Sequence, residues 1–269
     1  DARARWAKRI LLVFPLAANL GLLAAFKYPQ MLADTWTFFS QGQSYKLDIF
    51  LPAGLSFFTF ASMSYLIDVY RGELKPTNKI TDYAFFVSFF PMLVAGPIVR
   101  ASHFLPQLTR PLVISRVMLG TGITLILSGL FKKLVLADYL ALNFVERVFD
   151  NPTLYSGFEN LMAMYAYALQ IYGDFSGYSD MAIGLALLMG ITLPLNFNRP
   201  YQSASITDFW RRWHISLSSW LRDYLYVSLG GNRGVSVATV ILCLLFSALG
   251  GYVAWWQYQQ GEVGGIVGL

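Results

Sequence analysis

The sequence is poor in charge: lysine, arginine, aspartate and glutamate together make up 13% of its 269 residues. Soluble globular domains carry roughly 25%. In their place, 56% of the residues are hydrophobic, and the mean hydropathy is +0.49. Long apolar blocks separated by short polar stretches are typical of a protein that crosses a bilayer several times. The composition therefore excludes an ordinary soluble domain and predicts an all-α, polytopic membrane protein.

Cysteine and histidine are nearly absent. The single cysteine, Cys243, lies inside an apolar block, which excludes an intrachain disulfide and a thiolate metal cluster. The two histidines, His103 and His214, are far apart in the sequence and have no cysteine or histidine neighbour, an arrangement that does not suit zinc. We therefore expect no metal and no bound cofactor.

The formal net charge is +5 and the isoelectric point is about 9.2. The basic residues stand in short clusters between apolar blocks, which favours loops facing the cytoplasm and anionic lipid headgroups over a nucleic-acid surface. We expect a lipid bilayer as a partner and no nucleic acid. Because the chain begins with aspartate and shows no signal-peptide pattern, we also expect it to be an excerpt of a longer protein.

Several apolar blocks are long enough to be membrane spans or helices within a membrane domain. Together with shorter broken elements, they predict a single domain over residues 1–269 with about six to eight spanning or re-entrant segments. Residues 29–48 are expected to form a loop or an interfacial segment between the first two blocks. The blocks are Ile10–Tyr28, Leu47–Tyr70, 111–137, Phe158–Tyr172, Met181–Leu195 and Val235–Trp256.

Two further segments carry breaks within apolar surroundings. Residues 83–99 contain Pro91, Gly96 and Pro97, and a broken apolar segment is tolerated only when it is buried in protein or lines a cavity. Residues 173–180, GDFSGYSD, place Asp174 and Ser176 where unsatisfied polar groups would be costly. One interpretation makes this stretch a polar loop that lines a central chamber, and the other a tight glycine turn whose Asp174 caps the next helix.

The stretch 205–233, SITDFWRRWHISLSSWLRDYLYVSLGGNR, is the most distinctive in the chain. At 100° per residue its apolar side chains form one stripe from Ile206 to Tyr224, which predicts an amphipathic helix. Ser205 is expected to cap this helix. Asp208 has the i+3 and i+4 spacing to pair with Arg211 and Arg212.

His214 projects from the edge of the predicted stripe. An ionisable side chain at membrane depth is a functional candidate, but the same position also suits a structural histidine that is hydrogen-bonded to a carbonyl or to Ser218. Arg100 has two interpretations as well, as a residue that snorkels to the interface or as one that lines a cavity. We expect His103 to be an ordinary loop histidine.

The string DFWRRWHISLSSWLRDYLYVSLGGNR resembles the signature of the membrane-bound O-acyltransferase family, in particular its bacterial alginate O-acetylation and teichoic-acid D-alanylation branch. The earlier segments GPIVR (96–100) and GDFSGYSD (173–180) resemble the same family. The resemblance covers a core of about residues 51–233, whereas the tail 235–269 does not follow the family pattern. It implies re-entrant or broken helices around a central chamber.

The resemblance also implies an activity: transfer of an acyl group, usually acetyl, to a hydroxyl of an exported polysaccharide or cell-envelope polymer at the bacterial inner membrane. It implies an acyl donor such as acetyl-CoA or an acyl-carrier thioester, and a periplasmic or extracellular partner protein. Family members carry two functional histidines, and the second, downstream one is generally held to be catalytic. His214 matches the first, and no histidine follows it. The expected site comprises His214, with a chamber lined by Asp208, Arg211, Arg212, Trp213, Asp174, Ser176 and Arg100.

The missing second histidine leaves a competing class open. The chain could be a membrane transporter or channel whose broken segments 83–99 and 173–180 line a substrate path. It could also be a catalytically inactive scaffold.

Overall fold

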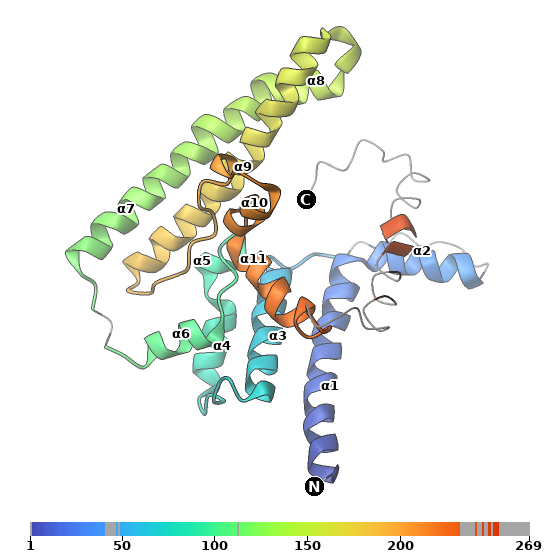
Figure 1. The fold of residues 1–269 in the computed structure, drawn as a ribbon, viewed down its shortest axis with the longest axis vertical. Coiled ribbons are helices and arrows are strands. Elements are labelled where there is room, and N and C mark those ends of the chain that lie inside the picture. The colour runs from blue at the N-terminus through green and yellow to red at the C-terminus, as the bar shows by residue number, and fades with distance from the viewer. Residues whose placement is uncertain are drawn as a thin grey trace. The chain divides into compact units, whose positions relative to one another are not determined.

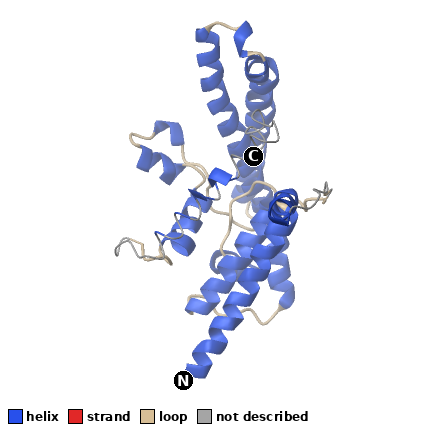
Figure 2. Cartoon of the chain, turned by 90° about the vertical axis from the view of Figure 1, so that its right-hand side faces the viewer, coloured by secondary structure: helices blue, strands red, loops and turns tan. Residues whose placement is uncertain are grey.

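The computed structural model describes residues 2–40, 47, 49–111 and 113–231, and seven further positions between 240 and 252. These residues form helices joined by loops and contain no strand (Figure 2), which confirms the all-α prediction. The chain divides into two units, Asp1–Ser218 and Ser219–Leu269. The first unit holds most of the described helices.

The first helix is the predicted first span. α1 runs over Ala2–Lys27, and its segment Trp6–Lys27 is the one helix of the described residues that is long and apolar enough to cross a membrane. The large side chains Leu11 and Phe14 are exposed on it, as suits contact with lipid. The stretch that follows was predicted as a loop or an interfacial segment, and α2 at Pro29–Ser40 excludes the loop for these residues.

The second predicted span, Leu47–Tyr70, is helical over only part of its length. α3 occupies Leu55–Arg71, and it contacts α1. The helix begins late because Gly54 adopts a left-handed conformation with a φ of 75° at the N-cap position. A Cβ at residue 54 would lie 2.6 Å from the carbonyl oxygen of Leu93, so glycine is needed there for close contact as well.

The predicted broken segment 83–99 is confirmed. α4 (Ile80–Ser88) and α5 (Phe90–Leu93) are separated by Phe89 in an extended conformation, and residues 94–100 form no helix before α6 (Ala101–Leu108). The break is buried in protein: Phe104 of α6 packs its ring 5.4 Å from that of Phe86 and 5.1 Å from that of Phe89.

A long helical hairpin follows (Figure 1). Its first arm is α7 (Arg116–Leu130), which continues through the π-helical turns η1 (Phe131–Asp138) and η2 (Ala141–Val145) into α8 (Glu146–Asp150). After the short η3 (Pro152–Leu154), the second arm is α9 (Gly157–Leu188), which begins with a capping box between Ser156 and Glu159. The two arms pack against each other along their length.

α9 corrects the prediction for residues 173–180. This stretch is neither a polar loop nor a glycine turn, and Asp174 does not cap a helix, because α9 passes through it without a break. Two lysines of the neighbouring arm neutralise the aspartates of this stretch. Lys132 pairs with Asp180 at 2.6 Å, and Lys133 pairs with Asp174 at 2.7 Å. The helix remains intact because its charges have partners on η1.

Glycines bring the two arms together at two levels. A Cβ on Gly129 would lie 2.5 Å from the carbonyl oxygen of Gly177, and one on Gly184 would lie 2.6 Å from that of Gly122. The glycines are seven residues apart on each helix, so the contacts recur after two turns of an antiparallel pair. We call Gly122, Gly129, Gly177 and Gly184 the glycine seam; small residues at helix contacts of this kind are typical of membrane proteins.

The predicted continuous helix from Ser205 is also wrong. η4 (Pro200–Gln202) leads to α10 (Ile206–Arg212), which Ser205 caps as predicted by accepting a hydrogen bond from the Asp208 amide. The chain then breaks at Trp213 and His214 before α11 (Ile215–Trp220).

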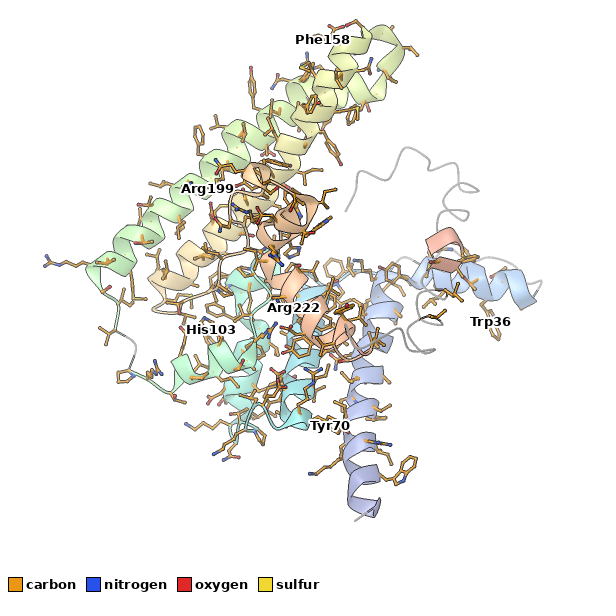
Figure 3. The ribbon with its side chains drawn as sticks, in the orientation of Figure 1. Trp36, Tyr70, His103, Phe158, Arg199 and Arg222 are labelled. Carbon is orange, nitrogen blue, oxygen red and sulfur yellow. The ribbon has the colours of Figure 1, made fainter. Side chains whose placement is uncertain are left out.

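The second unit is described only in part. η5 (Leu221–Tyr226) follows α11 and packs the Trp220 and Tyr224 rings 5.2 Å apart. The exposed side chain of Arg222 (Figure 3) pairs with Asp223 at 2.7 Å. Cys243 and most of the predicted last span, Val235–Trp256, lie outside the described residues.

The glycine seam predicts opposite effects of the same substitution at two positions of α7. Gly129→Ala should lower the free energy of unfolding by about 1–3 kcal/mol, because the methyl group has no space against Gly177. Gly120→Ala should raise it by about 0.5–1 kcal/mol, because a Cβ there meets nothing within 4 Å and alanine favours the helix. Thermal unfolding of both variants in detergent measures the difference, and equal midpoints would contradict the seam.

Candidate functional site

The break between α10 and α11 turns the chain at His214. Its φ is 43°, in the left-handed region that side chains other than glycine rarely adopt. Such a conformation costs of order 1–3 kcal/mol and persists only where the surrounding structure enforces it. Arg199, labelled in Figure 3, has a φ of 46° and is the one other non-glycine residue with a positive φ among those described.

Backbone hydrogen bonds from residues 196–198 hold this turn. The Asn198 amide donates to the Arg212 carbonyl at 2.9 Å, and the Ile215 amide donates to the Asn196 carbonyl at 2.9 Å. The two bonds bracket Trp213 and His214 from both sides. Residues 196–198, just before Pro200, therefore hold the break between the two helices in place through these backbone bonds.

The side chain of Asn196 forms a buried hydrogen-bond network next to this turn. Asn196 is 1% exposed, and its Oδ1 accepts from the Ser216 hydroxyl at 2.9 Å while its Nδ2 donates to the Ser179 hydroxyl at 3.1 Å. Ser179 in turn donates to the Ala95 carbonyl at 3.3 Å, and Ser216 accepts from the Ile98 amide at 2.9 Å. We call Ser179, Asn196 and Ser216 the asparagine network. It joins α9, the 191–199 segment, the start of α11 and the broken segment 94–100.

Aromatic rings surround the turn. Trp213 stacks on Phe209 with ring centroids 5.5 Å apart and meets Phe197 edge-on at 5.1 Å. His214 meets Phe175 of α9 edge-on at 4.7 Å and stacks on Phe197 at 6.4 Å. The imidazole therefore has an apolar wall on two sides.

Within this wall, one polar atom of His214 has no partner. The Nε2 atom is buried and makes no hydrogen bond to any residue that the structure describes. The predicted structural alternative, a side-chain bond to a carbonyl or to Ser218, is not found for this nitrogen; it is the backbone carbonyl of His214 that accepts from the Ser218 amide. A buried imidazole nitrogen can donate to or accept from a ligand, depending on its tautomer.

The charged residues of α10 are only partly as predicted. Arg212 pairs with Asp208 at 2.9 Å across one turn, and each side chain is about one-third exposed. Arg211 is exposed. The pair lies on the seven-residue α10 directly before Trp213, and so it stiffens the approach to His214.

The other predicted site residues lie in different surroundings. Asp174 faces η1 through its ion pair with Lys133, although its neighbour Phe175 contacts His214. Ser176 is 1% exposed, and its hydroxyl makes no hydrogen bond to a described residue. Arg100 occupies the N-cap position of α6 and is half-buried. Thus the structure groups Trp213 with His214 and directs Asp174 elsewhere.

The sequence does not reveal the asparagine network. In the segment NFNRPY (196–201), the first asparagine carries no local signal of burial. The one available hint was a polar residue directly after the apolar run that ends at Leu195. In the described part of the chain, no three His, Cys, Asp or Glu side chains gather as a metal-ligand set.

Comparison with known proteins gives a consistent set of relatives. The sequence profile of the membrane-bound O-acyltransferase family matches residues 43–250. A probable alginate O-acetylase from Pseudomonas aeruginosa is 46% identical over 93% of this chain and 48% of its own length. A peptidoglycan O-acetyltransferase from Helicobacter pylori is 39% identical over 91% of this chain and 51% of its own.

A more divergent relative is a teichoic acid D-alanyltransferase from Bacillus subtilis, which is 33% identical over 77% of this chain and 53% of its own length. The chain thus spans about half the length of the curated relatives it matches.

The asparagine network predicts a sharp contrast between two nearby asparagines. Asn196→Ala should lower the free energy of unfolding by about 2–4 kcal/mol, because it leaves the buried Ser179 and Ser216 hydroxyls each short of a partner. Asn198→Ala should change it by less than about 0.5 kcal/mol, since Asn198 is exposed and its bond to Arg212 comes from the backbone. Thermal unfolding in detergent compares them, and similar midpoints would refute the assignment.

Proposed function

The chain belongs to the membrane-bound O-acyltransferase family, and we propose that it transfers an acyl group, in the first place acetyl, to a hydroxyl of an exported polysaccharide or cell-envelope polymer. The relatives support this substrate class, because they are named for alginate, peptidoglycan and teichoic acid. We propose a thioester donor, either acetyl-CoA or an acylated carrier protein.

The observation that carries the proposal is the buried, unpartnered Nε2 of His214. In the reaction, the acceptor oxygen attacks the acyl carbonyl, an ester bond forms, the thiolate leaves, and the hydroxyl proton goes to a base. We propose that Nε2 binds the acceptor hydroxyl and orients it for attack. The aromatic wall around Phe175 and Phe197 would exclude water, which competes with the acceptor as a nucleophile.

We propose that His214 orients the acceptor hydroxyl, and we do not propose that His214 alone takes up the hydroxyl proton. The family resemblance places the base in a histidine farther along the chain, and no histidine follows His214 in this sequence. The backbone hydrogen bonds of residues 196 and 198 hold the turn at His214, and the asparagine network in turn holds Asn196. Asn196 is therefore a positioning residue in this proposal.

The neighbouring residues receive supporting roles. Trp213 would form part of the chamber wall, and Arg211 would meet anionic groups of the donor because its guanidinium is exposed one turn before the break. Arg212 and Asp208 would keep α10 in place through their ion pair. We propose Ser176 and Arg100 as more distant chamber residues, and we leave Asp174 to its pairing with Lys133.

We further propose a multi-pass location in the bacterial inner membrane. α1 is a suitable span, and the hairpin arms expose large apolar side chains that would face lipid, among them Leu127 and Phe131 on the first arm and Leu161 and Met164 on the second. A periplasmic or extracellular partner would carry the acyl group onward where the acceptor polymer lies outside the membrane. The transporter alternative is weakened, because one of its two broken segments is continuous helix.

The central test is acetyl transfer from labelled acetyl-CoA to acceptor polymer in membranes that contain the chain extended at its C-terminus by a segment that supplies the downstream histidine. His214→Ala should reduce transfer by 100-fold or more, which corresponds to about 2.7 kcal/mol of transition-state stabilisation. Thr207→Ala, an exposed change on α10, should leave transfer within twofold of the parent. Folding of both variants is checked by detergent gel filtration. Unchanged transfer in a folded His214→Ala variant would overturn the role of His214.

A second prediction asks whether the Asp208–Arg212 ion pair positions α10 for the reaction or only stabilises the fold. Asp208→Asn removes an ion pair that is one-third exposed, and such pairs contribute about 0–1 kcal/mol, so unfolding should change little. If α10 positions the site, acetyl transfer should nevertheless fall by about three- to tenfold. Comparison of transfer rate and melting midpoint in the same preparation tests this. Parallel losses of both would assign Asp208 to stability alone.

A further inference from the structure

A cavity separate from the His214 site lies beside the turn that follows the C-terminal end of α9. It has a volume of about 540 Å³, within the range of ligand-binding pockets. Its walls come from α6, from the start of α7 and the linker before it, and from the turn after α9 at Gly190 and Thr192. None of the residues of the His214 site lines it.

The side chain of Gln107 connects two walls of this cavity through hydrogen bonds. Its Nε2 donates to the Thr192 carbonyl at 3.1 Å, and its Oε1 accepts from the Thr192 amide at 2.9 Å and from the Thr192 hydroxyl at 3.0 Å. Three hydrogen bonds to one residue tie the turn to α6, although the two lie 85 positions apart in the sequence. These bonds fix two of the residues that line the cavity, Gln107 and Thr192.

Among the described residues that line the cavity, Arg110 is the one that carries a full charge at neutral pH. Arg110, His103 and Ser102 line the cavity, and no lining residue is acidic. None of these three side chains makes a hydrogen bond or an ion pair to another residue that the structure describes. His103 lies in α6 (Figure 3), so the expectation of a loop histidine is wrong. An arginine, an imidazole and a hydroxyl without carboxylate competition suit a phosphate group.

We propose that this cavity binds a phosphate-bearing anion, with Arg110 as the main contact and His103 and Ser102 as supporting donors. The same chemistry is offered by a soluble organic phosphate and by the headgroup of an anionic phospholipid. The proposal does not depend on the reaction at His214, because the two sites share no residue.

The test uses the full chain and a matched pair of arginine variants. Arg110→Gln removes the cavity cation. Arg116→Gln removes the same charge from an exposed residue at the start of α7 that does not line the cavity. In dodecyl maltoside, which carries no phosphate, titration calorimetry measures binding of inorganic pyrophosphate. In nanodiscs, native mass spectrometry measures retention of phosphatidylglycerol against phosphatidylcholine.

We expect Arg110→Gln to weaken binding about tenfold or more in at least one arm and Arg116→Gln to leave it within twofold. Loss in the pyrophosphate arm supports a soluble phosphate, and loss of phosphatidylglycerol retention alone supports a lipid headgroup. Equal losses in the two variants would show diffuse charge attraction and overturn the proposal. So would an Arg110→Gln variant that is folded and binds as the parent does in both arms.

Discussion

The site depends on the hydrogen bonds that the carboxamide of Asn196 makes. This carboxamide is almost fully buried, and its two ends bond to hydroxyls on two different elements, Ser179 of α9 and Ser216 of α11. A buried polar group stabilises an arrangement when it is fully satisfied and destabilises it when it is not. The network therefore favours one position of the broken segment 94–100, and with it the left-handed turn at His214.

α9 connects this network to the rest of the first unit. One face of the helix carries Gly177 and Gly184 into close contact with α7, and another carries Phe175 and Ser179 toward the His214 turn. Since the glycine seam fixes the helix at two levels, a substitution there would also displace the site. Packing on one face thus determines geometry on the other.

Features set by neighbouring residues could be predicted from the sequence, whereas features set by distant partners could not. α1, the Ser205 cap and the break near Pro91 follow from local composition. The stretch 173–180 was predicted to break because glycine and aspartate favour turns locally. Its actual partners on η1 lie more than 40 residues earlier. The break at Trp213 and His214 likewise comes from hydrogen bonds to the 196–198 segment, which no periodicity reveals.

The unpartnered nitrogen of His214 connects stability with function. A buried polar atom without a hydrogen bond costs about 1–3 kcal/mol, and the left-handed backbone at the same residue adds a cost of similar size. A glycine at this position would remove both costs, so core packing alone does not favour histidine there. A ligand hydroxyl that reaches Nε2 would regain the lost hydrogen bond on binding. An acceptor without a hydrogen-bonding group would not, and under the proposed function that difference would favour hydroxyl acceptors.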